Sequence, residues 1–213
     1  RIALARALAA NSKLLLMDEP FGALDPTIRA SVRATLADII RKVGVTSIMV
    51  THDQEEAFDL ADRVIVFNRG RIEQDGTPDE IMREPNSPFV MHFTGDVNQM
   101  PADSQFAKQM GVKTDKPEVM FRPEDVELRT STPRIDEEDF WCAATVNDAA
   151  PTENGYKFYL QLTPEMEVEY IQRHVDGQDG PGMFLASSQR VYIRVHSSRF
   201  MGYHPSELDS APV

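Results

Sequence analysis

Short apolar runs and amphipathic stretches alternate along the first half of the chain. Residues 14–17 and 45–50 are short, largely apolar runs that predict two strands, and the fully apolar run 14–17 is typical of a strand buried on both faces of a parallel sheet. Between them, apolar residues recur at helical spacing over residues 28–43, with Asp25 in position to cap the helix and Gly44 to end it. This order of strand, helix and strand predicts a layered α/β domain with a parallel sheet.

Three further elements continue this domain. Asp53 followed by Glu56 predicts a helix that begins with a capping-box-like start, and residues 77–80 predict a capping box at another short helix. Residues 63–74 predict a hairpin around a central Asn-Arg-Gly turn. Residues 1–10 show helical spacing with no capping residue ahead of them, so we expect a truncated helix and a missing upstream part of the protein.

The pattern changes in the second half of the chain. Residues 97–117 are polar and contain two prolines, which predicts a linker after a first domain of residues 1–96. Over residues 118–205, short stretches alternate between apolar and polar side chains and are separated by turns. This pattern predicts a second domain that is a small antiparallel β-barrel or sandwich. Residues 206–213 are expected to be a frayed tail.

Composition narrows the class of protein. The 213 residues carry a net charge of −12, from 34 acidic and 22 basic side chains. This balance argues against a nucleic-acid-binding groove, which needs clustered Lys and Arg. A single cysteine, Cys142, leaves no intrachain disulfide and favours a reducing compartment. The apolar runs are far shorter than the roughly 20 residues of a membrane helix, so any connection with a membrane must go through a partner.

Polar side chains follow both apolar strands. Asp18 and Glu19 come directly after the first strand, and His52 follows the second. In open parallel sheets, ligands bind outside the carboxyl ends of the strands, so these side chains are expected to be near neighbours. One carboxylate can hold Mg²⁺ through water, while the other orients and deprotonates the water that attacks a γ-phosphate. Alone, each motif also fits a solvated turn or a structural histidine; their order favours a site.

Taken together, these motifs resemble the ABC ATPases. Residues 14–20 look like the Walker B segment of that family, residues 22–25 like its D-loop, and His52 like its switch histidine. Residues 1–8 resemble the helix that directly follows the signature loop of the family. The resemblance covers about residues 1–95 and implies that they form the carboxyl-terminal part of a P-loop nucleotide-binding domain.

The resemblance also implies roles for four residues. Asp18 would serve Mg²⁺, Glu19 would be the general base, and His52 would contact the γ-phosphate of ATP. Asp25 would communicate across a dimer in which two ATPase subunits sandwich the nucleotide. The Gly-x-x-x-x-Gly-Lys-Ser/Thr loop, the signature loop and the Gln loop of the family do not occur in this sequence. The triphosphate then has no cradle, so we expect the chain alone to lack ATPase activity.

Two motifs further along resemble importers within this family. Residues 83–98 contain Glu-Pro, Phe-Val and Phe-x-Gly-x-Val-Asn, and they resemble the segment before the accessory domain of sulfate/thiosulfate importer ATPases. Residues 121–126 resemble the Arg-Pro-Glu segment that opens an OB-like accessory domain of the TOBE type. The implied function is ATP hydrolysis that energises uptake of sulfate or thiosulfate.

This resemblance implies partners and a location as well. The expected partners are integral-membrane permease subunits, a second ATPase subunit and, indirectly, an external substrate-binding protein, with no nucleic acid. The expected location is the cytoplasmic face of the plasma membrane, as a peripheral protein, or the stromal side of a plastid envelope.

Three alternatives stay open. The same machine could serve a polyamine, a sugar or iron. The protein could be a non-transport ABC ATPase that acts on DNA or ribosomes, but the acidic second half and Arg122-Pro123-Glu124 argue against this alternative. A binding module is the third, with a β domain that senses a ligand beside an inert catalytic remnant.

Overall fold

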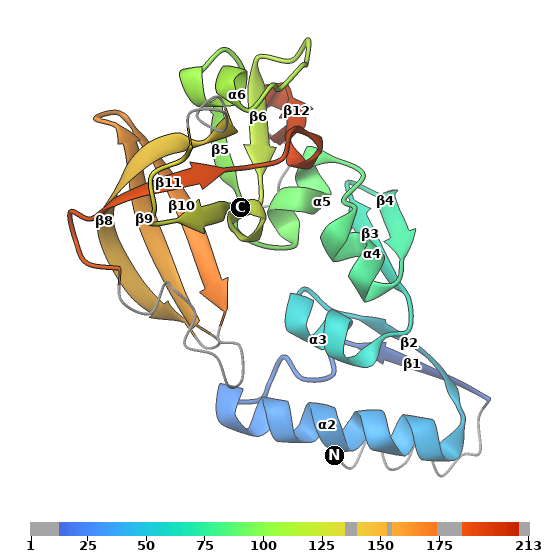
Figure 1. The fold of residues 1–213 in the computed structure, drawn as a ribbon. Coiled ribbons are helices and arrows are strands. Elements are labelled where there is room, and N and C mark those ends of the chain that lie inside the picture. The colour runs from blue at the N-terminus through green and yellow to red at the C-terminus, as the bar shows by residue number, and fades with distance from the viewer. Residues whose placement is uncertain (1–12, 135–139, 153–154, 174–184, 209–213) are drawn as a thin grey trace. The chain divides into compact units, whose positions relative to one another are not determined.

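The computed structural model describes residues 13–134, 140–152, 155–173 and 185–208. The chain forms two compact units, Arg1–Pro85 and Asn86–Val213 (Figure 1). The predicted helix over residues 1–10 lies outside the described residues. None of the helices in the described part of the chain combines the length and the apolar character that crossing a bilayer requires.

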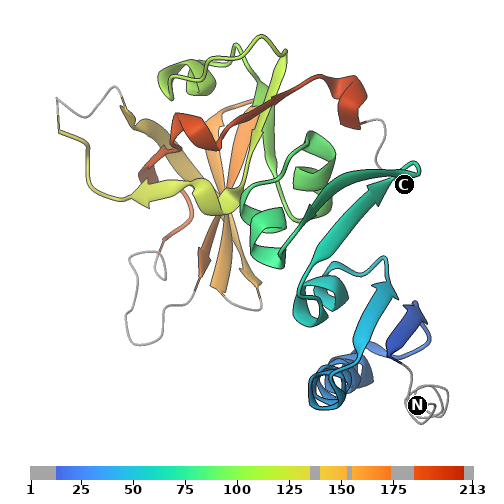
Figure 2. The same ribbon diagram turned by 90° about the vertical axis from the view of Figure 1, so that its right-hand side faces the viewer.

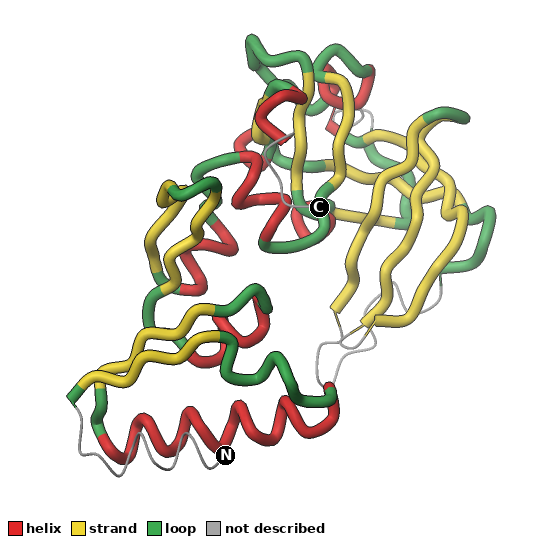
Figure 3. The backbone as a smooth tube through the Cα atoms, turned by 180° about the vertical axis from the view of Figure 1, so that it is seen from behind, coloured by secondary structure: helices red, strands yellow, loops and turns green. Residues whose placement is uncertain are grey.

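The first unit contains strands and helices in alternation. Its elements are β1 (Leu14–Asp18), α2 (Pro26–Val43), β2 (Thr46–Val50), α3 (Gln54–Leu60), β3 (Val64–Asn68), β4 (Arg71–Gly76) and α4 (Pro78–Arg83). The strands β1 and β2 pair in parallel, with Leu14 opposite Thr46 and Asp18 opposite Val50, and α2 is the crossover that a parallel pair needs. Figure 3 shows these two strands side by side. The predicted α/β order and the parallel pairing are confirmed.

Local capping and turn residues set the limits of these elements. The Asp25 side chain accepts a hydrogen bond from the Ile28 amide, and Gly44 ends α2 with a φ of 68° in the left-handed region. Thr77 and Glu80 form the reciprocal bonds of a capping box at α4. The β3–β4 hairpin turns through Arg69 and Gly70, at φ values of 48° and 75°. These parts of the prediction are confirmed.

The prediction that β1 is buried on both faces of the sheet is wrong. Leu15 is 6% exposed, whereas its neighbour Leu16 is 69% exposed. On the same face, Ile48 lies opposite Leu16 and is 55% exposed, and Leu14 and Val50 are also exposed. The sheet has two strands, and within the described residues only one of its faces is packed. Strand alternation therefore divides the apolar run into a buried row and an open row.

The second unit is built mainly from antiparallel strands (Figures 1 and 2). Its strands are β5 (Asn98–Pro101), β6 (Glu118–Phe121), β7 (Glu127–Arg129), β8 (Cys142–Thr152), β9 (Gly155–Thr163), β10 (Met166–Arg173), β11 (Arg190–Arg194) and β12 (Met201–Tyr203). They form a five-stranded sheet in the order β10-β9-β8-β11-β7 and a three-stranded sheet in the order β12-β6-β5. Its short helical elements are α5 (Pro88–Phe93), α6 (Gln105–Gln109), η1 (Pro123–Asp125), η3 (Ser197–Arg199) and α7 (Pro205–Leu208).

Both sheets of the second unit share one hydrophobic core. Phe121 on β6 and Leu160 on β9 are fully buried in it, and so is Ile193 on β11. Buried residues alternate with more exposed ones along strands such as β5 and β11, which is the predicted pattern of an antiparallel sandwich or barrel. The α/β and antiparallel-β fold class is thus confirmed.

The structure differs from the expectation at two segments. Residues 97–117, expected to be a linker, contain β5 and α6, and Met100 and Phe106 lie in the shared core. Polar residues and prolines surround these buried side chains in the sequence. The sequence pattern therefore does not indicate that this segment is folded. Of the expected tail, residues 206–208 belong to α7 and residues 209–213 lie outside the described part.

The two sequence motifs that resemble importers contact each other in the second unit. Arg122 donates from Nη2 to the Thr94 hydroxyl at 2.5 Å and from Nη1 to the Asp96 carbonyl at 3.3 Å. The Asn98 side chain bonds to both the amide and the carbonyl of Glu169 on β10. These contacts join the two motifs to each other and connect the first of them to β10.

Candidate functional site

The parallel register of β1 and β2 positions the site. Asp18 is the last residue of β1 and lies opposite Val50, the last residue of β2. The Glu19 amide donates to the Val50 carbonyl at 2.9 Å, which extends the pairing by one residue beyond both strands. The chain then leaves β2 through Thr51 and His52, so the two polar segments begin at the same edge of the sheet.

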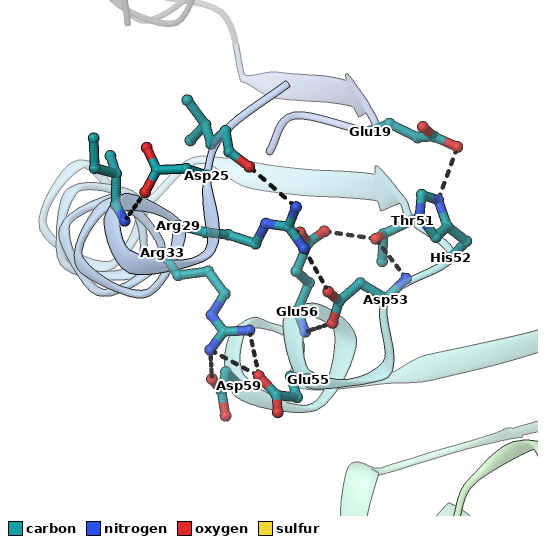
Figure 4. A network of polar contacts seen from close by, with 12 residues as sticks. Glu19, Asp25, Arg29, Arg33, Thr51, His52, Asp53, Glu55, Glu56 and Asp59 are labelled. Carbon is teal, nitrogen blue, oxygen red and sulfur yellow. Dashed lines mark hydrogen bonds and ion pairs between the residues drawn. The ribbon is translucent and has the colours of Figure 1, made fainter. Parts of the chain in front are cut away.

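Glu19 and His52 meet at this edge. His52 Nδ1 lies 3.1 Å from Glu19 Oε1, and the two side chains point toward each other (Figure 4). The carboxylate can only accept, so Nδ1 carries the proton in this contact, and a neutral imidazole then presents an unprotonated Nε2. Both side chains are largely exposed, at 54% for Glu19 and 76% for His52, so solvent screens the pair and leaves it accessible to a ligand.

The backbone of Glu19 is in an unusual conformation. Its φ is 41°, in the left-handed region that residues with a Cβ rarely adopt. The Glu19 carbonyl accepts from the Gly22 amide at 3.2 Å, which begins the tight turn that leads toward α2. Such strain is concentrated at functional sites in proteins, and here it falls on the residue with the candidate catalytic carboxylate.

Asp18 is exposed, and its carboxylate has no hydrogen-bonding partner among the residues that the structure describes. The described side chains contain no group of three His, Cys, Asp or Glu residues that would enclose a metal ion. Mg²⁺ is commonly bound by one or two carboxylates together with water and substrate phosphates. A single open carboxylate at a strand end therefore fits an ion of that kind.

Asp25 lies at the amino end of α2, where one carboxylate oxygen accepts from the Ile28 amide at 3.0 Å (Figure 4). Its contact in the structure is this helix cap, and the structure does not join it to the Glu19–His52 pair. The residue as a whole is exposed.

Behind His52 lies a polar network that the sequence only partly predicted. Thr51 Oγ1 donates to Glu56 Oε2 at 2.6 Å and accepts from the Asp53 amide at 3.0 Å. Asp53 caps α3 through the Glu56 amide, as predicted. Glu56, however, turns its side chain to Thr51 instead of completing a capping box with the Asp53 amide. In the sequence, the threonine two residues before Asp53 is the feature that could have indicated the contact between Thr51 and Glu56.

Comparison with known proteins gives close relatives but no family model that matches the chain. The sulfate/thiosulfate import ATP-binding protein CysA of Pseudomonas aeruginosa is 48% identical over 197 residues, which cover 91% of this chain and 54% of the relative. CysA of Pseudomonas syringae pv. tomato is 41% identical over 194 residues, with the same 91% and 54% coverage. This chain therefore spans about half the length of these curated relatives.

Among solved structures, cbiO1 from Clostridium perfringens, described as part of the ABC transporter complex cbiONQ, is 32% identical. The match covers 40% of this chain and 34% of cbiO1, with a TM-score of 0.37.

Proposed function

Because this chain is a homologue of the sulfate/thiosulfate import ATP-binding proteins, we propose that it is the carboxyl-terminal part of the ATP-hydrolysing subunit of an ABC importer. The observation that carries the proposal is the meeting of Glu19 and His52 at 3.1 Å, beside Asp18, at the carboxyl edge of a parallel sheet. This edge is where open α/β sheets bind their ligands.

Glu19 is the proposed general base. Its carboxylate accepts a proton from the water that attacks the γ-phosphate, and because His52 Nδ1 bonds to Oε1, the second oxygen, Oε2, can take this water. The contact with His52 can therefore stay in place while the water binds. Geometry in a nucleotide-free site is commonly looser than in the reacting complex.

His52 is the proposed contact to the γ-phosphate. If Nδ1 keeps its proton and its bond to Glu19, Nε2 can donate to a phosphate oxygen only after it takes up a second proton. A cationic imidazole in that position would place positive charge where the phosphoryl oxygens develop negative charge.

Asp18 is the proposed residue that holds Mg²⁺, through water, and Asp25 is proposed to lie near a second ATPase subunit across the nucleotide. Bound Mg²⁺ would neutralise charge on the β- and γ-phosphate oxygens. The exposed positions of Asp18 and Asp25 support these roles.

We further propose that the phosphate cradle is supplied by sequence outside these 213 residues. No Gly-x-x-x-x-Gly-Lys-Ser/Thr motif occurs here, and the relatives are about twice as long as the part that matches. The proposed partners are permease subunits in the bacterial plasma membrane, at its cytoplasmic face. The bacterial origin of the named relatives supports that location over a plastid envelope.

The cargo is proposed to be sulfate or thiosulfate, on the support of the names of the relatives. The test uses the completed subunit, meaning this chain preceded by the amino-terminal part of the Pseudomonas aeruginosa relative. It is expressed in a bacterium that lacks its own sulfate import ATP-binding protein, and uptake of ³⁵S-sulfate is measured. We expect uptake from the completed subunit and none from the same protein with Glu19→Gln.

Purified protein separates the steps. Glu19→Gln should bind ATP as the unmodified completed subunit does, while phosphate release falls by about 10²–10⁴-fold, the usual contribution of a general base. Near-normal hydrolysis by this variant would remove Glu19 from the base role. ATP hydrolysis without sulfate uptake would leave the ATPase in place and reject sulfate as the cargo.

A further inference from the structure

Arg29 on α2 contacts both segments that border the candidate site. Its Nη2 donates to the Leu24 carbonyl at 3.1 Å, in the loop that follows Glu19, and its Nη1 donates to Asp53 Oδ2 at 3.2 Å (Figure 4). A guanidinium group is planar and rigid, so two bonds from one group fix the relative positions of their acceptors. Arg29 therefore joins the loop that contains Leu24, called the Leu24 turn below, to Asp53, the residue that follows His52.

The connection continues on both sides of His52. Asp53 receives the Arg29 bond on one carboxylate oxygen and caps α3 with the other, through the Glu56 amide at 3.1 Å. Thr51 bonds to the Glu56 carboxylate and to the Asp53 amide. The two residues that flank His52 in the chain are thus anchored to each other and, through Arg29, to α2.

Burial strengthens this set of contacts. The Glu56 side chain is 3% exposed, and Arg29 Nε lies 4.0 Å from its Oε1. The Arg29 and Asp53 side chains are 28% and 23% exposed. A buried carboxylate requires a nearby positive charge and hydrogen-bond donors, and Arg29 supplies the charge here. The contacts of Arg29 are therefore less screened than those of a surface ion pair.

His52, in contrast, has little packing of its own. Its side chain is 76% exposed, and the contact that the structure gives it is the one to Glu19. An exposed side chain with one partner is directed by the backbone that carries it. Whatever holds Thr51 and Asp53 therefore determines where the imidazole lies.

We propose that Arg29 is a positioning residue that keeps His52 within reach of Glu19 and couples the position of the Leu24 turn to it. The inference rests on the proposed ATPase function. Arg29 itself touches neither Glu19 nor His52 in the contacts of the structure, so its effect passes through Asp53, Glu56 and Leu24.

Arg33 provides a matched control on the same helix. It lies about one turn further along α2 and also reaches α3, where it pairs with Glu55 and Asp59 at 3.2 Å each. The side chains of these two partners are 74% and 60% exposed, and neither flanks His52. Arg33→Ala and Arg29→Ala each remove one arginine that ties α2 to α3, but only Arg29→Ala removes the anchor next to His52.

The kinetic test uses the completed subunit. We expect Arg29→Ala to lower kcat by about 10-fold or more while KM for ATP changes less than about twofold, because the loss concerns the reacting arrangement and not nucleotide binding. Arg33→Ala should leave kcat within about twofold of the unmodified protein. Arg29→Lys should lie between them, since an ammonium restores the charge but not the two-armed geometry.

A spectroscopic test needs no activity. Long-range ¹H–¹⁵N spectra report the protonation and hydrogen bonding of each imidazole nitrogen, and the chain has five histidines, so His52→Gln identifies the relevant signals. Arg29→Ala should shift the His52 nitrogen signals, and Arg33→Ala should not. If Arg29→Ala does not fold, Arg29→Lys and Asp53→Asn take its place in both measurements.

The two proposals fail in different ways. Equal kcat values and equal His52 spectra for Arg29→Ala and Arg33→Ala, with Glu19→Gln inactive, would overturn the role of Arg29 alone. A completed subunit that binds no ATP and hydrolyses none would overturn the proposed function, while the His52 spectra would still report whether Arg29 holds the imidazole.

Discussion

Charged side chains in this protein divide into exposed and buried groups with different consequences. Glu19 and His52 are open to solvent, as side chains that must meet a substrate have to be. Glu56 and Lys157 are largely buried and have ion-pair partners, so they hold segments of the chain in place. Removal of a buried partner is costly because it leaves the other charge without compensation.

Lys157 gives a prediction at the scale of a single residue. Burial lowers the pKa of Lys157, but its hydrogen bonds to Asp96 and Glu169 outweigh burial and raise the pKa above its ordinary value. A group whose pKa is raised on folding stabilises the native state below its unfolded pKa, about 10.4, and loses that effect as pH rises further. We expect Lys157→Met to lower the free energy of unfolding by about 1–2 kcal/mol at pH 7.

The measurement is urea unfolding of both proteins at pH 7, 9 and 11. The difference between them should stay constant from pH 7 to 9 and shrink at pH 11. Lys116→Met is the control, because Lys116 pairs with Glu207 at the surface and its loss should hardly change the unfolding midpoint. A difference that grows with pH would contradict the assigned contacts of Lys157.

At the scale of elements, interactions between near neighbours could be predicted and distant ones could not. The Asp25 cap and the Asn-Arg-Gly turn depend on residues within four positions of each other, and both were predicted. Arg29 and Asp53 are 24 positions apart, and no periodicity links them. The pairing of β7 with β11 likewise joins residues about 65 positions apart, as in Tyr192 opposite Arg129.

The candidate site follows the same division. The strand ends located Asp18, Glu19 and His52 because a parallel pair brings its carboxyl ends to one edge. The sequence did not indicate that Leu16 lies on an open face, since an apolar run looks the same whether one or both of its faces are packed. Burial depends on what covers a strand, and that is a property of the folded chain.

Gly155 gives a prediction at the scale of the β9–β10 pair. A Cβ at this position would lie 1.9 Å from the Gln172 carbonyl oxygen, which belongs to the backbone of β10. The β10 backbone is paired with β9 here and cannot move aside without breaking ladder bonds, so Gly155→Ala should lower the free energy of unfolding by at least about 3 kcal/mol.

Gly111 is the matched control for this substitution. Its φ is 72°, and an added Cβ would meet nothing within 4 Å. Gly111→Ala should therefore cost only the left-handed strain, about 1–2 kcal/mol. Chemical denaturation of the two variants measures the difference, and equal losses would show that the β9–β10 contact is not the cause at Gly155.

At the scale of the whole molecule, the chain contains a candidate catalytic edge without a phosphate cradle. The relatives extend over about twice the aligned length, and the 213 residues contain no P-loop motif. The backbone amides and lysine of such a loop are what bind a triphosphate.

We therefore expect the purified 213-residue chain to release no phosphate from ATP above the rate of the Glu19→Gln variant of the same chain. The completed subunit should hydrolyse ATP under the same conditions. A colorimetric phosphate assay with Mg²⁺ present measures both. Hydrolysis by the chain alone that Glu19→Gln abolishes would contradict this expectation, since it would require a triphosphate site of a different kind.

Because the backbone of Glu19 is left-handed, the residue that is best for stability at this position differs from the residue that the proposed catalysis needs. Glycine adopts a φ of 41° without penalty, and asparagine tolerates it better than glutamate does. A library of variants screened only for heat resistance should accordingly enrich these two residues at position 19 and discard the carboxylate. Glutamate should be enriched at position 19 only in a screen that selects for transport. The heat-resistance screen and the transport screen should therefore select different residues at this position.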